Sequence, residues 1–126
     1  MKTVENIQEL EKLIGQLKAL HHEIGLLARK SPNDGINKFK LKMINGTISR
    51  ANALLGQEYM PFDDFSGFDE EDVPSNSDIT MVIAQYLEEA ERYRSNHVQQ
   101  EYSYYYYKVD GKLTDVRAAP PTWSKK

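Results

Sequence analysis

A regular series of large aliphatic residues near the start of the chain most constrains what this protein can fold into. The series advances in steps of three and four residues, which is a heptad pattern over nearly three repeats. Its members are Leu10, Leu13, Leu17, Leu20, Ile24 and Leu27. Ile7 and Ile14 widen the stripe, so we expect a helix over residues 3–30 that packs against two neighbours. Such a helix is about 40 Å long and needs partners along its whole length.

A second helix is predicted over residues 36–55, after a turn-forming segment at residues 31–35. The short connection predicts that the first two helices form an antiparallel hairpin. Gly56 is the expected left-handed C-cap, and Gly46 in the middle of the helix suggests close approach of another backbone. The expected apolar side consists of Ile36, Phe39, Met43, Ile44, Ile48, Ala51 and Leu55.

A third helix is predicted over residues 77–98, with Ser77 or Ser75 as its N-cap. From residue 102 the apolar period changes to two, which predicts strands over 102–109 and 112–117. Asp110-Gly111 between them is the favoured dipeptide of a type I′ turn. The resulting pairs are Val109 with Lys112, Lys108 with Leu113, Tyr107 with Thr114, Tyr106 with Asp115, Tyr105 with Val116, and Tyr104 with Arg117.

These elements predict a mainly α fold of the α+β class. An antiparallel helical hairpin and a third helix form a small bundle, and a β-hairpin follows at the C-terminus. A chain of 126 residues suits one domain, which we assign to residues 1–117. An isolated hairpin is marginal in water, so the strands must lie on the helices or join another chain. Residues 118–126 are expected to form a flexible tail.

The composition excludes several classes of protein. Hydrophobic residues make up 40% and charged residues 28% of the chain, which is typical of a globular protein. No apolar run approaches the roughly 18 residues of a membrane helix, and the first segment is too charged for a signal peptide. We therefore expect a cytoplasmic protein that makes no membrane contact. The absence of cysteine excludes disulfides, a Cys-ligated zinc and a cysteine nucleophile.

Charge is strongly segregated although the net charge is only -3. Residues 1–50 carry nine basic and five acidic side chains, and residues 92–126 carry seven basic and three acidic ones. Residues 51–91 carry eleven acidic side chains and no Lys or Arg. Such blocks attract one another within a chain or between copies, and the near-neutral total argues against a dedicated nucleic-acid binder.

An acidic loop is predicted over residues 57–76, where aromatic side chains alternate with carboxylates. Two interpretations stay open for this loop. It lies anchored on the chain's own helices, or it docks into a basic, apolar groove of another protein. The residues that would dock are Phe62, Phe65, Phe68, Asp63, Asp64 and Asp69.

The tyrosines form the second candidate site, because five of the eight lie between residues 102 and 107. Aromatic rings beside cationic side chains are typical of a nucleotide or single-strand platform. The candidate ligand-binding residues are Tyr104, Tyr106, Lys108, Arg117 and Arg94. The alternative interpretation is structural: one face of the strand packs on the helices and the other makes an oligomer contact.

No catalytic or metal-binding signature is present. The chain lacks nucleophile-elbow and phosphate-loop motifs. His21 and His22 are adjacent, so on a helix they point about 100° apart and cannot bind one ion together. We therefore predict no metal, no cofactor and no enzymatic activity. The predicted function is that of a small accessory protein that binds a protein partner or itself, as a homo-oligomer. The alternative is a binder of a nucleotide-like small molecule, and an enzyme is the third choice.

Overall fold

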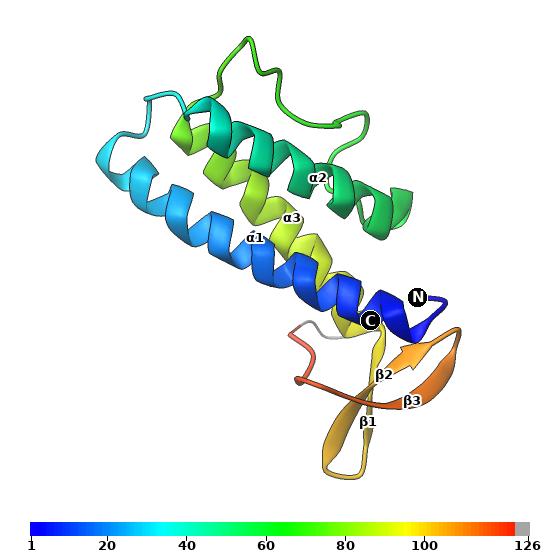
Figure 1. The fold of residues 1–126 in the computed structure, drawn as a ribbon. Coiled ribbons are helices and arrows are strands. Elements are labelled where there is room, and N and C mark those ends of the chain that lie inside the picture. The colour runs from blue at the N-terminus through cyan, green and yellow to red at the C-terminus, as the bar shows by residue number, and fades with distance from the viewer. Residues whose placement is uncertain (123–126) are drawn as a thin grey trace.

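A computed structural model describes residues 1–122 of the chain. In this part of the chain three helices precede three strands, as Figure 1 shows. The helices are α1 (Val4–Lys30), α2 (Lys38–Tyr59) and α3 (Asn76–Asn96), and the strands are β1 (Val98–Glu101), β2 (Tyr104–Val109) and β3 (Lys112–Ala118). This architecture confirms the predicted mainly α fold with a small β part. None of the helices in the described residues is both long enough and apolar enough to cross a membrane.

Each helix begins at a polar side chain that caps its first turn. Thr3 and Asn6 form a reciprocal capping box at the start of α1. Asn37 caps α2, and Ser75 caps α3, so the second of the two predicted serines is the correct one. Gly56 has the left-handed φ of +66° expected for a C-cap, but one more helical turn follows it to Tyr59. The sequence therefore predicted the first residues of the helices more accurately than their last residues.

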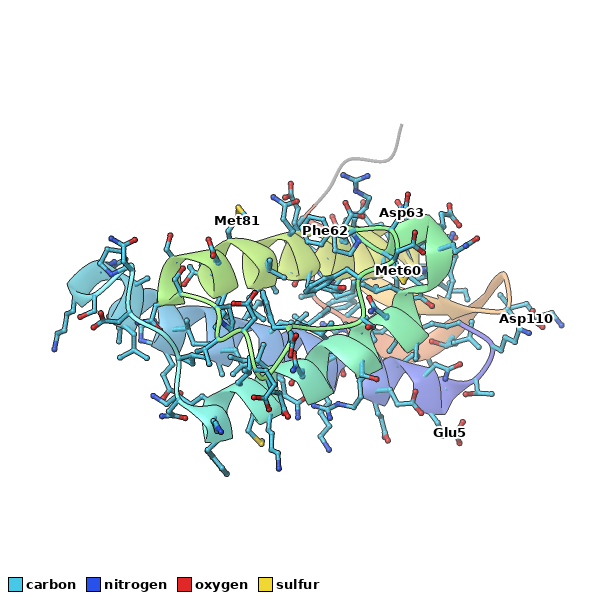
Figure 2. All side chains as sticks on the ribbon, turned by 90° about the horizontal axis from the view of Figure 1, so that it is seen from above. Glu5, Met60, Phe62, Asp63, Met81 and Asp110 are labelled. Atoms are coloured by element: carbon cyan, nitrogen blue, oxygen red, sulfur yellow. The ribbon has the colours of Figure 1, made fainter. Side chains whose placement is uncertain are left out.

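The aliphatic stripe of α1 forms much of the core. Its buried residues are Ile7, Leu10, Leu13, Ile14, Leu17 and Ile24, whereas Leu20 and Leu27 are partly buried against the core. In the view of Figure 1 α3 runs between α2 and α1, whereas from above, in Figure 2, α1 and α2 both lie to one side of α3. The contact of α1 with α3 is the most extensive of the three helix pairs, and that of α1 with α2 is the smallest. The first and third helices, not the first two, are therefore the best packed pair.

The buried side of α2 is rotated relative to the prediction. Leu41 and Thr47 are buried, whereas Phe39 and Met43, which were expected on the apolar side, are 74% and 54% exposed. The prediction for those two residues was wrong because α2 rests mainly on α3 and leaves the flank toward α1 open. Gly46 does not mark a close backbone contact either, since a Cβ built there would meet only the guanidinium of Arg50, at 3.7 Å.

The strands form an antiparallel sheet in the order β1-β2-β3. The sequence predicted only two strands, and it assigned Val98 to the third helix and Gln99–Glu101 to no element. The first turn of the sheet is at Tyr102, which has a φ of +56°. The second turn is at Asp110 and Gly111, whose φ values of +52° and +75° are both positive as a type I′ turn requires. The predicted hairpin turn is therefore confirmed.

The predicted strand register holds only next to that turn. Val109 pairs with Lys112 and Lys108 with Leu113, but beyond them the register shifts, so Tyr106 pairs with Arg117. The predicted pairs of Tyr106 with Asp115, of Tyr105 with Val116 and of Tyr104 with Arg117 are wrong. The side chain of Thr114 accounts for the irregularity, because its hydroxyl donates to the carbonyl of Tyr107 (2.7 Å) in place of a backbone N–H.

Candidate functional site

The phenylalanines of the acidic loop pack on the chain's own helices. Phe62, Phe65 and Phe68 are half-buried against the core. Their rings form a chain of edge contacts that ends on Tyr86 of α3, with centroid separations of 5.9 Å, 5.3 Å and, from Phe62 to Tyr86, 6.2 Å. Figure 2 shows Phe62 over α3. The loop thus covers the face between α2 and α3.

Two asparagines of α2, which the sequence did not single out, hold the backbone of the loop. The side chain of Asn45 accepts the N–H of Phe68 (2.8 Å) and donates to its carbonyl (2.9 Å). Asn52 donates to the carbonyl of Phe65 (2.8 Å) and accepts the hydroxyl of Tyr86 (2.7 Å). An amide that both donates and accepts can imitate a strand neighbour, so a helix side chain satisfies loop backbone. The signal was present as two Asn residues seven apart on one side of α2.

The carboxylates of the loop point to solvent. Asp63, Asp64 and Asp69 are exposed, and Asp69 accepts the N–H of Glu71 (2.9 Å). Within residues 1–122 none of these three carboxylates lies within ion-pair distance of a basic residue. Apolar packing and amide hydrogen bonds, not charge pairing, therefore hold this loop in place.

The tyrosines of β2 divide between two faces of the sheet. Tyr107 is fully buried, and Tyr105 and Val109 pack against the core from the same face. Tyr104, Tyr106 and Lys108 alternate with them and so lie on the outer face. Arg117, the partner of Tyr106 on β3, joins this face and places its guanidinium carbon 3.7 Å from the centroid of the Tyr104 ring. Four of the five predicted ligand residues are therefore together.

The fifth predicted ligand residue, Arg94, lies elsewhere and serves the fold. It is buried in α3, its guanidinium donates to the carbonyls of Ala119 and Pro120 (both 2.9 Å), and it pairs with Glu91 (3.1 Å). Thr122 also donates to Glu91 (3.1 Å). Residues 119–122 are thus bound to α3, although the sequence predicted a flexible tail from 118. The rest of that tail, 123–126, lies outside the described residues.

Beside Arg94, the hydroxyl of Tyr107 donates to Glu11 of α1 (3.2 Å). Burial, followed by the neighbouring Glu11 carboxylate, raises the pKa of Tyr107 to about 12. Strand β2 and the tail therefore lie across the face between α1 and α3.

An open groove of about 870 Å³ remains on the third face, between the first half of α1 and α2. The apolar part of its lining includes buried Leu13 with half-buried Leu54 and Tyr93. Met43 and Ala53 add exposed apolar surface along α2. The sequence did not predict this groove, because it assigned Met43 to a packed helical face.

Polar side chains rather than apolar packing bridge α1 and α2 along this face. Arg50 donates to Gln16 of α1 (2.9 Å), and Lys40 pairs with Glu23 (3.2 Å) nearer to the connection of the two helices. These bridges span the space between the helices without filling it, which is consistent with the small contact between α1 and α2.

An aromatic cluster supports Tyr93 in the groove. The ring of Tyr93 meets Tyr59 edge-on (5.0 Å) and stacks on His97 (4.4 Å). Nδ1 of His97 donates to the carbonyl of Tyr93 (2.7 Å), which requires the proton on Nδ1. Burial lowers the pKa of His97, and burial together with Tyr59 raises the pKa of Tyr93. Both rings are therefore neutral near pH 7, and Tyr93 presents an uncharged aromatic surface to the groove.

Metal binding finds no support in residues 1–122, where no group of three His, Asp or Glu side chains is placed to hold an ion. No family model matches the sequence, and comparisons with curated proteins and with solved structures found no significant match. The function of the chain is therefore inferred from its geometry.

Proposed function

We propose that this protein is a non-enzymatic interaction protein whose groove between α1 and α2 binds an amphipathic helix of a partner protein. The observation that carries the proposal is that two of the three faces between the helices are covered by other segments of the chain and the third is not. The acidic loop covers the face between α2 and α3, and β2 with residues 119–122 lies over the face between α1 and α3. The third face stays open over about 870 Å³ and exposes Met43 and Ala53.

The shape of the groove favours a helix as the ligand. The part of its lining that α1 supplies runs from Asn6 to Gln16, which is about 15 Å or roughly three helical turns at 1.5 Å per residue. A helix laid between two others inserts its residues at i, i+3, i+4 and i+7 into such an apolar surface. Contact with Leu54, Met43 and Tyr93 would complete a four-helix arrangement around this face.

The charges of the groove favour a partner helix with acidic flanks. Its lining contains Lys2, Lys12 and Arg50 against a single carboxylate, Glu9. Within the described residues none of these three cations is within ion-pair distance of a carboxylate. Asp and Glu beside the apolar stripe of a partner helix would supply the complementary negative charge. Such complementarity steers association and selects the partner.

A second copy of the chain is a poorer ligand for the groove. The acidic and apolar segment that a copy offers is its loop, and the rings of that loop are already packed on its own helices. Self-association and a cytoplasmic location stay predictions from the sequence, and sedimentation analysis of the purified protein tests the first of them.

Selection from a displayed library of helical peptides tests the groove. We expect enriched peptides to carry apolar residues at helical spacing with Asp or Glu beside them, and to bind at least tenfold more weakly to Met43→Asp. Met81→Asp is the matched control, since Met81 is 59% exposed on α3 and Met43 is 54% exposed. Figure 2 shows Met81 projecting from α3 on the side away from α1 and α2.

Two results would overturn the proposal. The first is equal binding of the selected peptides to Met43→Asp and Met81→Asp, which would place their site outside the groove. The second is a selection without any preference for acidic residues, in which case Lys12→Glu with Arg50→Glu would leave the affinity unchanged. Both outcomes are measured by fluorescence anisotropy on the selected peptides.

A further inference from the structure

We infer that the outer face of the sheet binds single-stranded nucleic acid, with bases stacked on Tyr104 and Tyr106 and phosphates held by Lys108 and Arg117. This site is separate from the α1–α2 groove and does not depend on it. The inference rests on the faces to which the structure assigns the tyrosines, on the unpaired cations beside them and on the distance of the acidic loop.

The two rings are positioned as neighbouring stacking surfaces. Tyr104 and Tyr106 are two residues apart on one strand, so they project from the same face about 7 Å apart. Tyr104 is 50% exposed. The inner tyrosines, Tyr105 and Tyr107, pack on the helices and leave the outer rings without a role in the core. Arg117 covers one face of the Tyr104 ring, so a base can stack on the other face of Tyr104 and on the half-buried ring of Tyr106. Every base has a π-face that stacks on an aromatic ring.

The cations of this face are available for phosphate. The guanidinium of Arg117 lies over the ring of Tyr104, at 3.7 Å from its centroid, which fixes its direction across the face. Among the described residues neither Arg117 nor Lys108 is within ion-pair distance of a carboxylate. Two exposed carboxylates lie on the strands that flank β2. Glu101 of β1 pairs with Tyr104, and Asp115 of β3 lies two residues from Arg117.

The net charge of -3 argues against a dedicated nucleic-acid binder, but the structure separates the charges. The eleven acidic residues of 51–91 lie on the loop and the helices. In Figure 1 the acidic loop is above α2, whereas the sheet is below the start of α1. Charges further apart than about 10 Å are largely screened at 0.1 M salt. A strand on the outer face therefore meets the side chains of the sheet, among them Lys108 and Arg117, rather than the average charge of the chain.

The spacing of the two rings selects a strand over a single nucleotide or a duplex. One base on an open face buries little surface, whereas two adjacent bases engage both rings at once. In a duplex the base faces are stacked on one another and cannot reach the tyrosines. Single-stranded DNA or RNA is therefore the ligand that uses all four side chains.

Fluorescence anisotropy with a labelled oligo-dT of about 12 nucleotides, within the usual range of single-strand site sizes, tests the inference. Tyr104→Ala and Tyr106→Ala should each weaken binding about 5- to 150-fold, the range measured for loss of one stacked base. Tyr102→Gly is the matched control. It removes a 92% exposed tyrosine from the turn outside the face, and glycine tolerates the positive φ there. Its affinity should stay within twofold of wild type.

Salt dependence tests the two phosphate contacts separately. Two contacts predict a slope of log affinity against log salt of about -1.4, and Arg117→Gln should reduce it to about -0.7. Arg117 is exposed, so this variant keeps the fold.

Three results would overturn the inference. The first is the absence of a saturable change up to about 0.1 mM protein, the weak end of non-specific nucleic-acid binding. The second is equal affinity for duplex DNA, which would mean attraction by charge alone. The third is a dimer in sedimentation that Tyr104→Ala dissociates without any oligonucleotide binding, because the face would then be a contact between copies. None of these results bears on peptides selected for the groove.

Discussion

The two hydrogen bonds from Asn45 to the backbone of Phe68 predict how the acidic loop responds to mutation, independently of any partner. Replacing Asn45 by Ala removes the hydrogen bonds to the N–H and to the carbonyl of Phe68, at 2.8 and 2.9 Å. A hydrogen bond of this kind contributes a net 0.5 to 1.5 kcal/mol, so the loop should lose about 1 to 3 kcal/mol of local stability. The population with an open loop then rises about 5- to 150-fold.

Limited proteolysis with chymotrypsin measures that population, because cleavage follows the open fraction when reclosing is faster than cutting. We expect faster cleavage of Asn45→Ala within residues 62–68, identified by mass spectrometry of the fragments. Ala is also a better helix former than Asn, which offsets part of the loss in global stability. The matched control is therefore Ser49→Ala, which gives α2 a comparable gain at an exposed position without a loop contact.

Cleavage of Asn45→Ala at the rate of Ser49→Ala would refute this reasoning. The three phenylalanine rings alone would then hold the loop, and the amide contacts of Asn45 would contribute nothing measurable. Faster cleavage spread over all the helices would also contradict it, since the amide contacts would then stabilise the whole fold instead of the loop.

Two further predictions concern the core and the buried tyrosine. Leu17 is fully buried, so Leu17→Ala should lower the free energy of unfolding by about 2 to 5 kcal/mol in urea, whereas exposed Gln8→Ala should change it by less than about 0.5 kcal/mol; equal midpoints would mean that the stripe is not buried. The pKa of Tyr107 is raised from 10.0 to about 12 in the folded protein. The contribution of its neutral hydroxyl to the free energy of unfolding is therefore complete below pH 10 and is lost as the pH rises toward 12. This loss amounts to about 2 to 3 kcal/mol. The free energy of unfolding of Tyr107→Phe should therefore fall less between pH 10 and 12 than that of the wild type. Identical falls in the two proteins would contradict the raised pKa of Tyr107.

Elements specified by short stretches of sequence could be predicted from the sequence alone. The stripe from Leu10 to Ile24 repeats within one helix and places its own residues in the core. Thr3, Ser75 and Asp110-Gly111 act on backbone groups within about three residues of themselves, so caps and the type I′ turn need no tertiary partner. Tyr104, Tyr106 and Lys108 share a face because strand residues alternate, whatever the strand packs against.

Features that join distant segments were decided only in the tertiary structure. The helical pattern places Glu11 on the solvated side of α1. In the structure it accepts a hydrogen bond from the hydroxyl of Tyr107, which lies 96 residues further along the chain. Strand β1 has a single apolar residue, Val98, and forms because β2 is available to pair with it. The α1–α2 groove depends on the angle and separation of helices whose contact with one another is small. Periodicity determines which side of a helix is apolar, but only packing against α3 determines which part of that side is left uncovered.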